Sequence, residues 1–135
     1  MTENIPLNVK GFHPYGELIG LTFIQLEKGF SQCKLEVEKK LMNPHGSLHG
    51  GVMYSMADTG MGAAIYPLLE ENESCATIEV KITYFKPVSN GALVCETKVI
   101  HKGRSTCALE SEIRVEGKLV AKATGTYSIF SLGKS

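Results

Sequence analysis

The sequence has no excess of charge of either sign. Its 14 Lys and Arg residues balance 14 Asp and Glu residues, and the pI is about 6.9. Nucleic acids and anionic membranes are bound mainly through clustered positive charge, which this composition does not supply over a broad surface. We therefore expect neither as a partner, and any basic binding site must be local.

The cysteines show no pairing or metal-binding pattern. They lie in separate segments without C-x-x-C spacing, at Cys33, Cys75, Cys95 and Cys107. The first ten residues, MTENIPLNVK, have neither the charged start nor the apolar run of a signal peptide. We therefore expect reduced thiols and a cytoplasmic protein.

Several common catalytic and cofactor motifs are also missing. No serine lies in a G-x-S-x-G turn, no cysteine lies beside a histidine, and no phosphate-binding loop or dinucleotide fingerprint is present. His45 and His49 are four residues apart, but Pro44 and Gly46 predict a turn there, and no third metal ligand is evident. We expect no metal and no separate cofactor.

The stretch GGVMYSMADTGMGAAIYPLL, twenty residues from 50 to 69, contains no Lys, Arg or Glu. Its length would allow a membrane span, but the central Asp58 would cost about 2.5–3.5 kcal/mol on insertion and Pro67 interrupts the far end. We expect instead a helix near 50–66 that is enclosed by other structure, with Gly60 and Gly62 marking close packing against a neighbouring backbone.

The flanking segments alternate between polar and apolar residues, which is typical of strands with one covered face. Turn signals at Lys102–Gly103 and Glu116–Gly117 separate the last three strands and favour an antiparallel meander. The expected strands are 21–27, 33–37, 76–84, 93–101, 104–115 and 118–130. The pattern predicts one α+β domain over 1–135, with the sheet curled around the helix.

Asp58 is the only charged residue of the apolar segment, and the motif N-x-x-G-x-x-H-G-G-x6-D precedes and includes it. The glycines allow close approach of a ligand to a helix start whose first N–H groups have no intrahelical partner, a setting that suits a developing negative charge. A simple Gly-Gly turn and a structural acid are the alternatives. A desolvated carboxylate is costly, which favours a general base or a nucleophile.

The spacing of Gly50 and Asp58 predicts a shared site. Eight residues on one helix correspond to about 12 Å along its axis, whereas a reacting carbonyl must lie roughly 3 Å from both its oxyanion donors and the attacking group. Two antiparallel copies could bring Gly50 of one chain to Asp58 of the other, so we expect a symmetric dimer with two composite sites.

The motif residues, followed by TIEVKITYFKPV (77–88) and HKGRSTCALESEI (101–113), resemble the hotdog-fold acyl-CoA thioesterases, particularly the phenylacetate-pathway type. The resemblance covers about residues 18–130. It implies a long helix wrapped by a curved antiparallel sheet, dimers that extend the sheet across two chains, and commonly a dimer of dimers (homotetramer).

The resemblance also implies roles for individual residues. The Gly50 N–H would bind the thioester carbonyl oxygen, and Asp58 of the partner would activate water or attack the carbonyl. Asn43 would position the water or the thioester. His49 either orients the carbonyl or is a structural residue at the helix start, and Thr77 either lies near the water or is an ordinary strand residue.

Coenzyme A, which would be part of the substrate, carries phosphates. The candidate binding groups are Lys86 and the turn formed by Lys102, Gly103, Arg104 and Ser105; the alternative for each is a solvated charge. The sequence thus predicts hydrolysis of a small or medium acyl- or aryl-CoA thioester. A hotdog-type enoyl-CoA hydratase or dehydratase and a non-catalytic acyl-CoA-binding protein are the alternatives.

Overall fold

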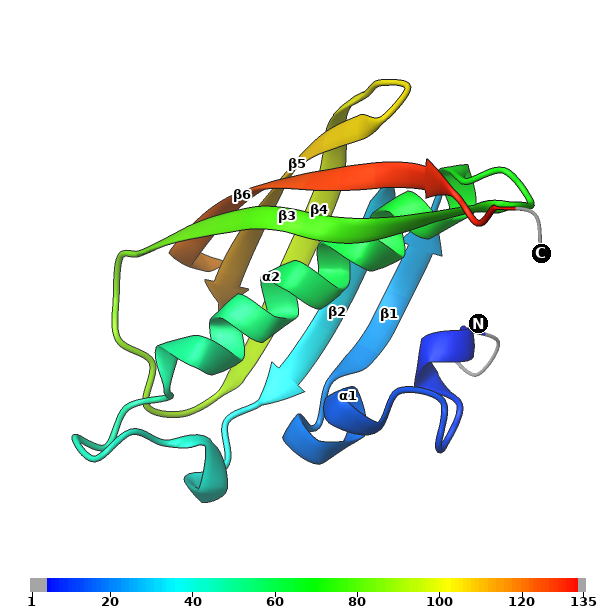
Figure 1. Cartoon of the computed structure of the whole chain (residues 1–135). Helices are drawn as coiled ribbons and strands as arrows, with labels where there is room; N and C mark the ends of the chain where they lie inside the picture. Colours follow the sequence, from blue (N-terminus) through cyan, green and yellow to red (C-terminus); the bar gives the residue numbers. More distant parts are fainter. Residues whose placement is uncertain (1–4, 134–135) are drawn as a thin grey trace.

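A computed structural model describes residues 5–133 of the chain (Figure 1). One helix, α2 (Gly50–Ile65), lies across a six-stranded antiparallel sheet whose strand order is β1-β2-β4-β5-β6-β3. The strands are β1 (Thr22–Glu27), β2 (Phe30–Glu36), β3 (Glu73–Tyr84), β4 (Ala92–Lys102), β5 (Thr106–Val115) and β6 (Lys118–Ser131). The expected α+β architecture is confirmed.

The last three strands form the predicted meander. β4 pairs with β5, and β5 pairs with β6, in both cases antiparallel. Glu116 and Gly117 connect β5 to β6 with φ angles of 50° and 80°, the left-handed geometry that a tight two-residue hairpin turn requires. Along β5 and β6 the alternating apolar side chains face α2 and pack against it.

The inner face of α2 carries the core. Met56, Met61 and Ile65 are fully buried. The helix ends before Pro67, which lies in a short 3-10 turn, η4 (Tyr66–Leu68). A Cβ at Gly60 would lie 2.8 Å from Thr97 Oγ1, so this glycine packs closely, but against a side chain rather than the expected backbone. At Gly62 an added Cβ would have ordinary contact distances, so the expectation for this glycine is wrong within the protomer.

The opposite face of α2 is only partly covered, in contrast to the fully enclosed helix that the sequence suggested. Gly51 and Tyr54 are exposed, while Asp58 and Gly62 are half-buried. No helix within residues 5–133 has the length and apolar character needed to cross a membrane.

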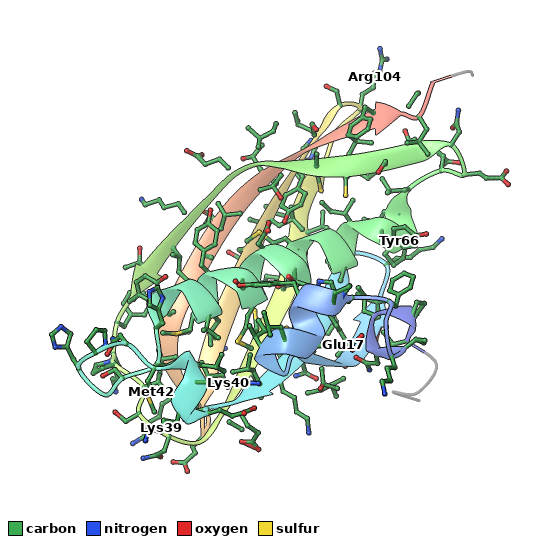
Figure 2. All side chains as sticks on the ribbon, turned by 60° about the horizontal axis from the view of Figure 1, so that its bottom comes forward. Glu17, Lys39, Lys40, Met42, Tyr66 and Arg104 are labelled. Carbon is green, nitrogen blue, oxygen red and sulfur yellow. The ribbon has the colours of Figure 1, made fainter. Side chains whose placement is uncertain are left out.

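The N-terminal segment covers part of this face, as Figure 2 shows. It contains η2 (Pro6–Asn8) and α1 (Pro14–Ile19), and Tyr15 Oη of α1 lies 2.7 Å from Ser55 Oγ of α2. A further 3-10 turn, η3 (Lys39–Leu41), precedes the loop that leads to α2. The sequence did not predict α1, because six residues with an internal glycine leave too short a pattern.

Strand β3 is an edge of the sheet. It pairs with β6 on one side only, from Glu73 to Tyr84. Ile78 lies at an irregularity in this pairing and its side chain is 59% exposed. A long edge strand with an exposed apolar residue is a template for pairing with another strand.

Candidate functional site

Two hydroxyl groups hold the carboxylate of Asp58. Thr77 Oγ1, from β3, donates a hydrogen bond to Asp58 Oδ1 over 2.8 Å. Tyr127 Oη, from β6, lies 2.5 Å from the same Oδ1 and 2.6 Å from the Asp58 carbonyl oxygen. The structure therefore brings together two of the predicted site residues, Thr77 and Asp58.

Tyr127 is a site residue that the sequence analysis missed. Its side chain is only 3% exposed and packs in the core beneath α2. Burial, together with the neighbouring Asp58, raises the pKa of the Tyr127 phenol far above its usual value. The phenol therefore stays protonated and remains a hydrogen-bond donor throughout the pH range in which proteins are normally assayed.

The two oxygens of the Asp58 carboxylate have different environments. Both side-chain bonds go to Oδ1, and within residues 5–133 Oδ2 has no hydrogen-bond partner. An ionised carboxylate with one fixed and one open oxygen can accept a proton from water or attack a carbonyl carbon.

The start of α2 forms the second half of the candidate site. His49 is its N-cap, and His49 Nδ1 accepts a hydrogen bond of 2.8 Å from the Gly51 N–H. The described part of the chain supplies no acceptor for the Gly50 N–H. Glycine is needed here because a Cβ would approach the Tyr84 ring to 2.9 Å, and the Tyr84 hydroxyl donates to the Gly50 carbonyl oxygen.

Asn43 shapes the loop before the helix. Its Oδ1 accepts hydrogen bonds from the N–H groups of His45 and Ser47, at 2.9 and 3.1 Å. Asn43, Gly50 and Lys86 line one open groove of about 480 Å³. Three of the expected site residues therefore share one surface at this end of the helix.

The turn formed by Lys102, Gly103, Arg104 and Ser105 lies elsewhere. In Figure 1 the β4–β5 turn projects at the end of the sheet opposite the start of α2. The turn is nevertheless connected to the Asp58 region, because Cys107 of β5 is the register partner of Tyr127. The predicted site residues of one protomer thus fall into two separate groups. Gly50, Asn43 and Lys86 form the first group, and Asp58 and Thr77, near the turn, form the second.

Within residues 5–133 no three His, Cys, Asp or Glu side chains gather at metal-binding distance. The hydroxyl groups around Asp58 are poor ligands for the common transition metals.

Residues 45–122 match the family model described as the thioesterase superfamily. The chain belongs to this superfamily. The matched range includes Gly50, Asp58, Thr77 and the β4–β5 turn, while Tyr127, Asn43 and the N-terminal segment lie outside it.

The matches to known proteins cover most of the chain. This chain is 34% identical to an esterase-like protein of Saccharolobus solfataricus, over 83% of this chain and 75% of the relative. It is 30% identical to the 1,4-dihydroxy-2-naphthoyl-CoA hydrolase of Listeria monocytogenes, over 74% of this chain and 81% of the other.

A solved structure of the phenylacetic acid degradation protein PaaI from Thermus thermophilus superimposes with a TM-score of 0.80. The two chains are 28% identical, and the match covers 85% of this chain and 97% of that one. The resemblance to the hotdog thioesterases of the phenylacetate type is confirmed. This protein is a thioester hydrolase with the hotdog fold.

Proposed function

We propose that this thioesterase hydrolyses acyl-CoA thioesters, with Asp58 as the group that activates water or attacks the carbonyl. The observation that carries the proposal is the carboxylate whose Oδ1 is held by Thr77 and Tyr127 while Oδ2 stays open. The naphthoyl-CoA hydrolase relative supports coenzyme A as the thiol part of the substrate.

Two routes lead from this arrangement to the same products. In the first, Asp58 Oδ2 takes a proton from water, the hydroxide oxygen adds to the thioester carbonyl, and the C–S bond breaks as the thiolate leaves and is protonated. In the second, Oδ2 adds to the carbonyl, the thiolate leaves, and water hydrolyses the acyl anhydride on Asp58. Both release one free acid and one coenzyme A for each water consumed.

The oxyanion formed in either route needs a donor that this protomer does not place beside Asp58. Gly50 is eight residues away on the same helix, about 12 Å along its axis. A second protomer with its α2 antiparallel would bring its own Gly50 N–H to this Asp58. The exposed edge of β3 offers the surface for such a dimer, because pairing two β3 edges would continue the sheet across both chains.

The same dimer would assemble the expected coenzyme A site. Lys86 shares its groove with Gly50 and Asn43, whereas Lys102 and Arg104 belong to the turn near Asp58. Antiparallel protomers would place the turn of one chain near the helix start of the other. The phosphates would then meet basic side chains from both chains.

His49 has a structural role in this proposal. Its Nδ1 caps α2, and this positions the following N–H groups. The hydratase alternative gains no support, because the side chains that contact Asp58 within residues 5–133 carry hydroxyl groups rather than an imidazole.

The test is thiol release from a panel of acyl-CoA thioesters by the wild-type protein and by Asp58→Asn. Hydrolysis of at least one acyl-CoA by the wild type, and its loss in a folded Asp58→Asn variant, is the expected result. A folded wild-type protein that binds acyl-CoA without turnover would contradict the proposal and favour a non-catalytic binding role.

A further inference from the structure

The helix start that carries the Gly50 N–H consists of two successive glycines. Glycine has more conformational freedom to lose than any other residue, whereas an oxyanion donor is effective only when its position is fixed before the reaction. Gly50 is half-buried and Gly51 is exposed, so the core does not enclose this turn. The position of the donor therefore depends on the hydrogen bonds that hold the turn.

Some of these hydrogen bonds lie within the turn itself. The Gly50 N–H belongs to the peptide plane that it shares with the His49 carbonyl group. That carbonyl oxygen accepts a hydrogen bond of 3.0 Å from the Val52 N–H, and the Gly51 N–H donates to His49 Nδ1. These two bonds define the shape of the turn, but they do not attach it to β3 or to α1.

Two hydroxyl groups in series attach the turn to α1. Ser55 Oγ donates a hydrogen bond of 2.8 Å to the Gly51 carbonyl oxygen, and a serine hydroxyl has only one hydrogen to donate. In the 2.7 Å contact between Ser55 Oγ and Tyr15 Oη, the tyrosine is therefore the donor. The bonds run from Tyr15 through Ser55 to the carbonyl group of Gly51, the residue after the proposed oxyanion donor.

Tyr84 of β3 provides a second attachment. Its hydroxyl donates to the Gly50 carbonyl oxygen over 2.7 Å. The first two carbonyl groups of α2 thus each accept a hydrogen bond from a hydroxyl group, and the supporting residues come from different elements, α1 and β3. A turn that is held by two separate elements has little freedom to tilt.

The segment that carries Tyr15 is itself well anchored. Ile19, at the end of α1, is only 5% exposed and belongs to the core. Asn8 binds the backbone of Phe23 in β1 through both its amide oxygen and its amide nitrogen, each over 2.8 Å. A hydroxyl group on this support can restrain the start of α2, because the support is fixed to the sheet.

We propose that Tyr15 is a positioning residue for the reaction. Through Ser55 it holds the first turn of α2, so that the Gly50 N–H keeps the direction that an oxyanion donor requires. The inference rests on the proposed oxyanion role of Gly50. Tyr15 precedes the region that matches the superfamily model, which begins at residue 45, so the N-terminal segment would add this support from outside the matched region.

Tyr15→Phe and Ser55→Ala test the two hydroxyl groups. The first variant keeps the ring and removes only the donor, and the second removes the link to the helix. The measurement is steady-state thiol release with the best substrate of the acyl-CoA panel. We expect kcat to fall about 2–10-fold in each variant, the factor in rate that corresponds to one neutral hydrogen bond. KM should stay unchanged, because an oxyanion donor acts mainly in the transition state.

The double variant shows whether the two residues act as one unit. If Tyr15 acts only through Ser55, the double variant loses no more activity than Ser55→Ala alone. Ser55→Thr is the matched control and should keep the wild-type kcat, because a threonine hydroxyl can bond to the same carbonyl oxygen four residues earlier. Leu18→Ala changes the exposed side of α1, where Leu18 is 64% exposed, and should also keep it.

A second measurement does not depend on activity. NMR order parameters of backbone ¹⁵N nuclei report motion on the picosecond-to-nanosecond timescale, with about 0.85 typical of a rigid backbone. The values for Gly50 and Gly51 should fall in Tyr15→Phe and Ser55→Ala and recover in Ser55→Thr. A hydrogen bond that only stabilises the fold would lower the temperature of thermal unfolding and leave these order parameters and kcat unchanged.

The outcomes separate the two proposals. Suppose that the wild type hydrolyses acyl-CoAs and Asp58→Asn does not. Folded Tyr15→Phe and Ser55→Ala variants that keep either the wild-type kcat or the wild-type order parameters then overturn the positioning role, and the proposed function stands. If the wild type hydrolyses none of the panel, thioester hydrolysis at Asp58 fails and the positioning role fails with it.

Discussion

The hydroxyl of Tyr127 lies 2.5 Å from Oδ1 of Asp58, although 69 residues separate the two in the sequence. Together with Thr77 it fixes one carboxylate oxygen and leaves the other open. This contact joins the last strand of the sheet to the central helix at the point where the proposed chemistry occurs.

Removing the Tyr127 hydroxyl should weaken catalysis without emptying the core. Tyr127→Phe keeps the buried ring, but the carboxylate loses a hydrogen bond of a kind worth about 1.5–3 kcal/mol. We expect kcat/KM to fall about 10–100-fold.

The control for this variant is Tyr54→Phe. Tyr54 also donates its hydroxyl to a backbone carbonyl oxygen, that of Val80, but makes no bond with Asp58. Its kcat/KM should match that of the wild type. A folded Tyr127→Phe variant that keeps the wild-type kcat/KM would show that Tyr127 supports the fold alone.

Asp58→Asn should nearly abolish hydrolysis in a folded protein. The amide oxygen can still accept hydrogen bonds from Thr77 and Tyr127, but the side chain cannot act as a base or form the acyl anhydride. Loss of general-base catalysis alone corresponds to about 10²–10⁴-fold. Thiol release and thermal unfolding, measured on the same preparation, distinguish this result from misfolding; near-wild-type turnover would remove Asp58 from the mechanism.

The edge of β3 should control both assembly and activity. Ile78→Lys places a charge on the exposed edge, where it should oppose pairing with a second copy. We expect light scattering to show a dimer or tetramer for the wild type at micromolar concentration, and a monomer with little activity for the variant.

Ile100→Lys provides a matched control for the edge variant. Ile100 is 58% exposed, nearly the same as Ile78, but it lies on β4, away from the β3 edge. This variant should keep the wild-type mass and activity. An Ile78→Lys monomer with full activity would argue against a site shared between chains.

The outer face of the sheet should contribute a small, pH-dependent stabilisation. Arg114 Nη1 and Lys122 Nζ contact the Glu112 carboxylate at 2.9 and 3.4 Å. These contacts hold the pKa of Glu112 below its usual value, and the hydrogen bond from Arg114 contributes most. Because the folded pKa is the lower one, the stabilisation is complete above the unfolded pKa and is lost as pH falls through the folded pKa.

Glu112→Gln should therefore lower the free energy of unfolding by about 0.2–1 kcal/mol at neutral pH, since the pair is partly exposed. Denaturant unfolding should show this difference shrinking at acidic pH. Glu36→Gln, which removes no ion pair within residues 5–133, is the control. A difference that persists at acidic pH would assign the effect of Glu112 to packing instead.

Local sequence patterns were sufficient for most of the fold. Alternating residues predicted the strands within a few residues, Pro67 marked the end of α2, and Glu116–Gly117 marked a hairpin. The short helix α1 carries too few residues for a periodic signal, and its position depends on tertiary contacts such as that between Tyr15 and Ser55.

The candidate site was predictable only in part. Asp58 stood out because a lone charge in an apolar segment is costly, whereas Tyr127 looked like an ordinary inward-facing residue of a strand. Its contact with Asp58 depends on the register of β6 against β3 and β5, which local patterns do not encode. The N-terminal segment was not predictable either. Leu7 and Phe12 line a cavity together with residues of α2, and local patterns do not show that this segment folds back over the helix.

Complementation between two inactive variants tests whether Asp58 and the Gly50 N–H act together across two chains. One chain carries Asp58→Asn. The other carries Gly50→Pro, which removes the N–H. The helix should tolerate this change, because proline is favoured at the first helical position. In addition, His49 already has the extended conformation that precedes proline, with φ −61° and ψ 132°. Because a Cβ at position 50 would meet the ring of Tyr84, this chain also carries Tyr84→Ala, and Tyr84→Ala alone is its matched control.

The measurement is thiol release by differentially tagged heterodimers, purified after co-expression, beside each parent homodimer. In a composite arrangement one of the two sites combines the intact Gly50 of the first chain with the intact Asp58 of the second, and the other site carries both lesions. We expect about half the activity per dimer of the wild type, because the Tyr84 beside the working Gly50 belongs to the first chain and is intact, from parents that are each reduced by roughly 10²-fold or more. Folded heterodimers that are no more active than their parents would contradict the composite arrangement.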